Sequence, residues 1–134
     1  MRTDIRRWLA LSQITLLATT LSCLGNMDGK CEEHQFREIA APGGKVKAIE
    51  YHSTCEGPVY VATIEVADAS GSGRATAMHA RMVSRATPPV WPELKVEWKS
   101  DKELWITYPS GVDTTCVSSP PGVAVHCLDA SIAR

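Results

Sequence analysis

The chain has 134 residues and a formal net charge of −1 at pH 7, and 44% of its residues are hydrophobic. A nearly neutral chain lacks the basic surface that binding to nucleic acid or to anionic lipid headgroups requires, so neither is an expected partner. Once an N-terminal export segment is set aside, the remaining length fits one domain with one core.

The N-terminal segment has the three parts of an export signal. Three arginines precede a mostly apolar stretch at residues 8–24, and the small residues Ser22, Cys23 and Gly25 lie at its end. This order of basic, apolar and small-residue regions is typical of a signal peptide. We therefore predict a signal peptide at residues 1–22 and export of the rest of the chain to an oxidising compartment.

Three fates of this segment are compatible with the sequence. Cleavage after Ser22 would make Cys23 the first mature residue, as in bacterial lipoproteins, with a lipid anchor on Cys23 and a polar tether at residues 23–30. Cleavage after Gly25 would instead release a soluble protein. An uncleaved anchor is the third fate, but the apolar stretch is short for a membrane span and polar residues interrupt it. We favour a lipoprotein of the periplasm or outer membrane, which contacts the membrane only through its lipid.

The cysteine count supports export. Apart from the cysteine at the end of the signal, four cysteines remain, and an even number in a small exported chain predicts disulfides with three alternative pairings. We predict the pairs Cys31–Cys55 and Cys116–Cys127. In the second pair, the cysteines would face each other across a hairpin that turns at residues 120–122, at the spacing that a disulfide needs.

Strand patterns dominate the mature chain. Residues 31–40 are mixed, and the helical spacing of Phe36 and Ile39 allows either a short helix or a first strand. Alternating or β-branched runs predict further strands at residues 45–51, 59–66, 78–83, 94–99 and 104–108 and around the last two cysteines. The expected fold is mainly β, an antiparallel sheet of about six strands with hairpins, in one domain at residues 31–134.

The clearest hairpin lies in the second half of the chain. Apolar residues alternate with other residues at 94–99 and again at 104–108, and residues 100–103 form a polar turn between them. One face of this hairpin is apolar and should pack on the core. Trp98 is on that face, whereas Trp105 is on the opposite one.

A resemblance rests on two blocks of sequence. Residues 41–45, Ala-Pro-Gly-Gly-Lys, lie between Cys31 and Cys55, and residues 96–108 contain a tryptophan strand, a polar turn and Leu-x-Ile-x-Tyr. Together they resemble a family of small exported bacterial proteins of unassigned function. Its members carry Cys, then Ser-Pro-Asp-Gly-Lys and a strand containing Ala-Val, then Asp-Cys-Gly. Here alanine replaces the serine, Gly-Gly replaces Asp-Gly, and Glu56 follows the second cysteine. The resemblance implies the Cys31–Cys55 bridge and a β-rich fold, and it implies no activity.

Candidate catalytic and metal-binding residues are few. His52, Cys55 and Glu50 have a spacing that a metal site could use, but a disulfide-bonded cysteine is a poor ligand and too few other ligands are present. Ser53 is adjacent to His52, and adjacent residues on a strand point to opposite faces. Glu50 and Glu56 bracket a turn without any sign of a cleft. We therefore assign no catalytic residue, no metal and no cofactor.

The tryptophans are the stronger candidates for function. Trp91 lies in the proline-rich segment 87–92, which cannot lie inside a sheet because proline lacks the N–H donor. An exposed Trp91, together with Trp105, could form a binding platform for a sugar ring, a peptide or a partner protein. Alternatively, Trp91 folds back as a lid over an open sheet end, which we favour because a small domain needs its large side chains buried.

These patterns favour a non-catalytic protein of the cell envelope that binds another envelope protein or a cell-surface component. The alternative is a disulfide-braced inhibitor-like or structural module that offers a sheet edge or loop to its partner. A small hydrolase is the third hypothesis. A connected polar cluster around His52 or His79 in a deep pocket would favour the hydrolase, and a flat apolar patch that includes Trp91 would favour binding.

Overall fold

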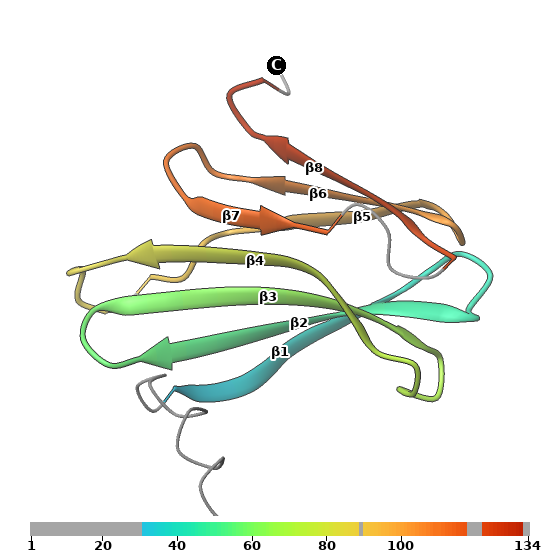
Figure 1. Cartoon of the computed structure of the whole chain (residues 1–134), viewed down its shortest axis with the longest axis horizontal. Coiled ribbons are helices and arrows are strands. Elements are labelled where there is room, and N and C mark those ends of the chain that lie inside the picture. The colour runs from blue at the N-terminus through green and yellow to red at the C-terminus, as the bar shows by residue number, and fades with distance from the viewer. Residues whose placement is uncertain (1–30, 89, 118–121, 133–134) are drawn as a thin grey trace, which may run out of the picture.

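The described residues form two facing β-sheets. The computed structural model describes residues 31–88, 90–117 and 122–132. The predicted signal peptide at 1–22, Cys23 and the tether at 23–30 lie outside these residues. The described part contains strands and no helix (Figure 1): β1 (Glu32–Ala40), β2 (Val46–Cys55), β3 (Val59–Asp68), β4 (Ala75–Val83), β5 (Lys95–Ser100), β6 (Glu103–Tyr108), β7 (Asp113–Cys116) and β8 (Ala124–Asp129).

The larger sheet has five strands in the order β1-β2-β3-β4-β7, and all its pairs are antiparallel. Strands β1 to β4 follow one another as a meander, because short turns suffice to join antiparallel neighbours. The sequence allowed either a short helix or a strand at residues 31–40, and the structure has strand β1 there. Its register against β2 shifts between Gln35 and Arg37, so β1 contains a bulge at Phe36.

The smaller sheet has three strands in the order β5-β6-β8. Strands β5 and β6 form the predicted hairpin, and β8 pairs with β6 in parallel. The hairpin predicted between the last two cysteines is therefore wrong, because β7 pairs with β4 in the larger sheet. The mainly β fold is confirmed, and the part of the chain that the structure describes has eight strands in two sheets rather than about six strands in one.

Both predicted cysteine pairs are confirmed as disulfides. Cys31–Cys55 joins the segment before β1 to the end of β2, and Cys116–Cys127 joins the two sheets. Disulfides of this kind form and persist in oxidising compartments outside the cytoplasm. In the part of the chain that the structure describes, no helix is long and apolar enough to cross a membrane.

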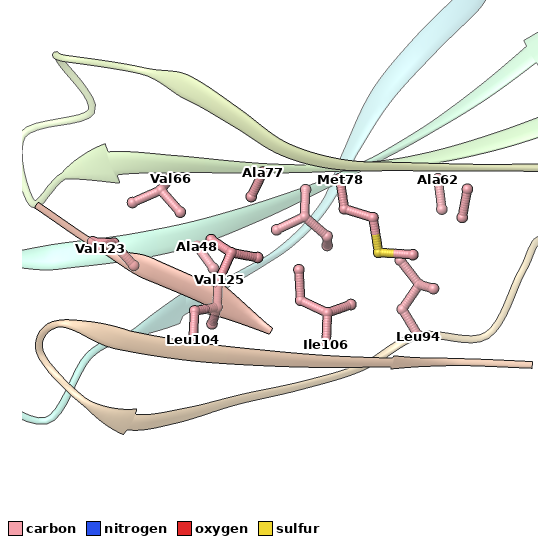
Figure 2. Close-up of a cluster of buried hydrophobic side chains, with 12 residues drawn as sticks. Ala48, Ala62, Val66, Ala77, Met78, Leu94, Leu104, Ile106, Val123 and Val125 are labelled. Carbon is pink, nitrogen blue, oxygen red and sulfur yellow. The ribbon is translucent and has the colours of Figure 1, made fainter. Parts of the chain in front are cut away.

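The core lies between the two sheets. Its buried side chains come from both of them, as Figure 2 shows, and from the segments just before β5 and β8: Ala48, Ala62, Ile64, Val66, Ala77, Met78, Ala80, Leu94, Leu104, Ile106, Val123 and Val125. Trp98 packs against this cluster, as its place on the apolar face of the hairpin predicts. Its indole Nε1 donates a hydrogen bond to the carbonyl oxygen of Ile39 at 2.9 Å, which ties β5 to β1.

We expect Trp98→Phe to lower the free energy of unfolding by about 1 kcal/mol, because it leaves the Ile39 carbonyl without its indole donor. Trp105→Phe is the matched control, since the Trp105 indole donates to the Glu103 carboxylate on the outer face of the smaller sheet. That loss should be smaller, because water can replace the lost donor there. Urea denaturation of both variants measures the difference, and equal losses would contradict the role assigned to Trp98.

Candidate functional site

The candidate site lies where the chain passes from the larger sheet to the smaller one. The crossover segment, residues 84–94, leaves the end of β4 and reaches the start of β5 at one end of the two sheets (Figure 1). Its described residues, 84–88 and 90–94, have no regular strand structure, in agreement with the prolines of the segment. Trp91 lies on this segment, so the backbone around Trp91 is not part of either sheet.

A cluster of polar side chains around the buried Glu50 lies beneath the crossover segment. Glu50 is only 2% exposed, on the inner face of β2. Arg37 pairs with Glu50 across the β1–β2 register, and its Nε donates to Glu50 Oε2 at 2.6 Å. His52 Nε2 lies 2.9 Å from Glu50 Oε1, because alternate residues of a strand share a face. We call Arg37, Glu50 and His52 the Glu50 cluster.

The Glu50 cluster also holds the crossover segment in place. Arg37 Nη2 donates a hydrogen bond to the carbonyl oxygen of Leu94 at 2.8 Å. One guanidinium thus bridges the larger sheet and the segment that carries Trp91. Both carboxylate oxygens of Glu50 have a partner, as a carboxylate removed from water requires.

Aromatic rings pack on both faces of the His52 imidazole. The Phe36 ring stacks on one face, with centroids 4.1 Å apart, and the Trp91 indole stacks at 5.4 Å. The rings of Tyr60 and His34 meet Trp91 edge-on, at 5.2 and 5.9 Å. These five residues form the aromatic cluster. Phe36 is 54% exposed, so the outer end of the stack faces solvent.

Two clefts border Trp91. The β2 cleft has a volume of about 410 Å³ and is lined by the Glu50 cluster, Phe36 and residues 90–94. The β4 cleft has a volume of about 650 Å³ and is lined by residues 81–83, 90–93 and 109–113. The indole of Trp91 is therefore a shared wall between two clefts, each of which is lined by both apolar and charged residues.

The two tryptophans predicted as a binding surface have separate neighbours. Trp91 contacts rings from β1, β2 and β3 at the end of the larger sheet. Trp105 lies on β6, where its Nε1 donates to Glu103 at 2.7 Å and its ring lies 5.0 Å from the imidazole of His126. Trp91 is half-buried over His52, while Trp105 belongs to the outer surface of the smaller sheet.

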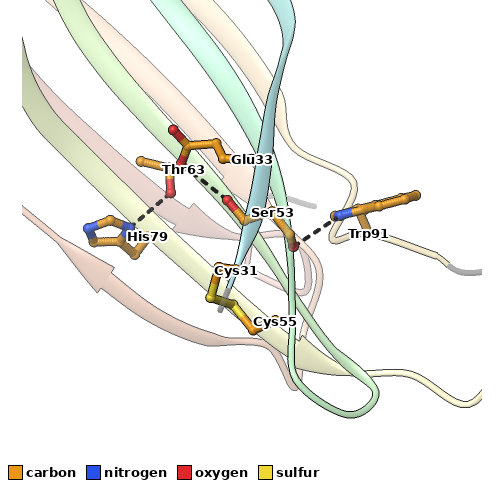
Figure 3. Close-up of a disulfide and its surroundings, with 7 residues drawn as sticks. All are labelled: Cys31, Glu33, Ser53, Cys55, Thr63, His79 and Trp91. Atoms are coloured by element: carbon orange, nitrogen blue, oxygen red, sulfur yellow. Dashed lines mark hydrogen bonds between the residues drawn. A yellow bond between two sulfur atoms is a disulfide. The ribbon is translucent and has the colours of Figure 1, made fainter. Parts of the chain in front are cut away.

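Ser53 and Cys55 do not join the Glu50 cluster. Ser53 Oγ donates to Glu33 Oε2 at 3.1 Å on the outer face of the larger sheet, whereas the backbone carbonyl of Ser53 accepts from Trp91 Nε1 at 3.3 Å (Figure 3). Cys55 is bonded to Cys31. Within the described residues, no group of three or more histidine, cysteine, aspartate or glutamate side chains could hold a metal ion.

Arg37 and Phe36 are site residues that the sequence analysis missed. The sequence also gave no sign of a cleft beside Glu50, yet Glu50 lines one. The spacing of Glu50 and His52, two residues apart on a strand, was the signal that could have placed both on one face. Comparison with known protein families, curated proteins and solved structures gives no match.

Proposed function

We propose that the protein is a non-catalytic binding module of the cell envelope that contacts its partner around Trp91. The observation that carries this proposal is the position of Trp91, between two clefts and on a segment that belongs to neither sheet. Tryptophan is among the residues that contribute most to binding when it lies in a desolvated pocket. The Glu50 cluster and the Leu94 carbonyl fix the segment in advance, which lowers the entropy lost on binding.

Export supports this role. The two disulfides favour an oxidising compartment, and residues 1–22 have the composition expected of an export signal. We propose that the mature protein starts at Cys23 and carries a lipid there. Intact-mass measurement of the protein purified from the envelope tests this step. If the mature protein instead starts at Asn26 and carries no acyl group, then it is the soluble form and the lipoprotein proposal is wrong.

We expect Trp91→Ala to weaken partner binding by about ten-fold or more, because it removes the wall shared by both clefts. A photo-crosslinking amino acid in place of Val90, which is 50% exposed, should give a discrete adduct in intact cells. The adduct should disappear in the Trp91→Ala background and persist in the matched Trp105→Ala background. An adduct that does not depend on Trp91 would contradict the proposal.

A small hydrolase is the second candidate, and the contact between Glu50 and His52 favours it. A carboxylate 2.9 Å from an imidazole can orient a general base. The neighbouring hydroxyl of Ser53 faces away, so such an enzyme would have to activate water. A panel of chromogenic ester and peptide substrates tests this candidate. Hydrolysis that His52→Gln abolishes in a folded protein would replace the binding proposal by an enzymatic one.

A further inference from the structure

We propose that the β4 cleft binds an extended peptide segment of a partner protein, which adds as a strand beside the end of β4. This inference rests on the proposed binding function and names the chemical class of its ligand. It depends on the backbone of Val83, on the residues that line the β4 cleft and on the protection of the edge strands β1 and β5.

The end of β4 has an unpaired backbone edge. Strand β7 pairs with β4 only as far as Arg81↔Asp113, and β4 continues to Val83. The Ser84 N–H donates to the Pro58 carbonyl at 2.9 Å, on the side of β3. Since successive residues direct their N–H and C=O groups to alternate sides, Val83 directs both groups away from β3. Strand β7 begins at Asp113 and does not reach Val83, and no described residue pairs with Val83 on that side.

The cleft beside this edge matches the side chains of an added strand. The side chain of Val83 points outward and is 61% exposed, whereas the side chain of Met82 belongs to the inner face, and both residues line the cleft. A peptide residue opposite Val83 would also point outward, and its two neighbours would point inward. They would point into the cleft, which is lined by Trp91 and Val112. The expected ligand therefore has two apolar residues that flank one β-branched residue.

Two other sheet edges are protected against strand addition. Strand β1 has a bulge at Phe36 and three glutamates along its nine residues. Strand β5 carries Lys95, Glu97 and Lys99, with Glu97 carboxylate oxygens 3.4 and 3.5 Å from the two ammonium groups. Bulges and charges of this kind are the usual protection of edge strands. The end of β4 carries the exposed Val83 instead, and the cleft beside it is lined by both apolar and charged residues.

Val83→Pro tests the proposal, because it removes one N–H that faces away from the sheet. The probe is a library of random linear peptides displayed on phage, selected on the disulfide-bonded exported protein. We expect the selection to enrich peptides with the apolar–β-branched–apolar pattern. Their affinity for Val83→Pro should be about ten-fold lower or more, because the variant loses one backbone hydrogen bond to the added strand and its proline ring does not fit beside that strand. Trp105→Ala should leave their affinity unchanged.

A second measurement does not depend on how the variant folds. N-methylation of the peptide amide that faces the Val83 carbonyl should abolish binding to the unaltered protein, and methylation of the next amide should not. Failure to enrich any peptide, or equal binding by Val83→Pro, would overturn the strand proposal. A dimer in gel filtration that Val83→Pro dissociates would also overturn it, by making a second copy the occupant. None of these results alters the crosslinking test at Val90, so the two proposals fail separately.

Discussion

Reduction of both disulfides should unfold the domain at room temperature. Cys31–Cys55 spans a sequence separation of 24 residues and Cys116–Cys127 one of 11. On the chain-entropy estimate each bond contributes about 3 kcal/mol, so together they contribute about 6 kcal/mol. A domain of this size has a total stability of roughly 5–15 kcal/mol, so the loss is comparable to the whole. Urea denaturation with and without a reductant measures it.

The two bonds should act independently. Cys55 ends β2, whereas the register places Cys116 level with Glu50 in the middle of β2 and three strands away, so the two bonds lie apart in the sheet. Effects at distant sites add. Replacement of either pair by serines should therefore cost about 3 kcal/mol, and replacement of both should cost the sum. A reduced protein that keeps its full stability would contradict this account and weaken the inference of an oxidising compartment.

Local patterns identified the strands but not the sheet to which each belongs. The alternation at residues 94–99 and 104–108 placed the β5–β6 hairpin correctly, because both strands and their turn are adjacent in sequence. Strand β7 has only four residues, and its partner β4 is some thirty residues earlier in the chain. Cys116 and Cys127 pair as predicted, yet they pair between sheets. Pairing between segments far apart in sequence leaves no local pattern to detect.

The bulge in β1 explains why half of the site was missed. His34, Arg37 and Ile39 pair with His52, Glu50 and Ala48 respectively, so they share the inner face. An odd step separates His34 from Arg37, because the bulge inserts one residue and breaks the two-residue period. The same insertion gave this segment its helical spacing of apolar residues. Trp91 was found because its flanking prolines exclude a sheet whatever the tertiary structure is.

Arg37→Met should lower the free energy of unfolding by about 3 kcal/mol. The substitution keeps the length of the aliphatic chain but leaves the buried Glu50 carboxylate without its guanidinium partner, 2.6 Å away. Breaking a buried ion pair by removing one partner costs about 3–5 kcal/mol. We expect the lower end of that range, because the Arg37 side chain is 40% exposed and water screens part of the interaction. Urea denaturation at neutral pH measures the loss.

Removal of both charges separates the cost of an unpaired carboxylate from the value of the pair itself. Arg37→Met combined with Glu50→Leu should recover most of the stability, because apolar residues of similar volume often replace a buried ion pair without loss. Lys47→Met is the control, since the ion pair of Lys47 with Glu38, 2.9 Å apart, involves a half-exposed carboxylate. Its loss should stay below about 1 kcal/mol. If the double variant is no more stable than Arg37→Met, then the unpaired Glu50 carboxylate is not the cause of the lost stability. In that case the anchoring of the crossover segment through Arg37 and the Leu94 carbonyl would account for most of the stability.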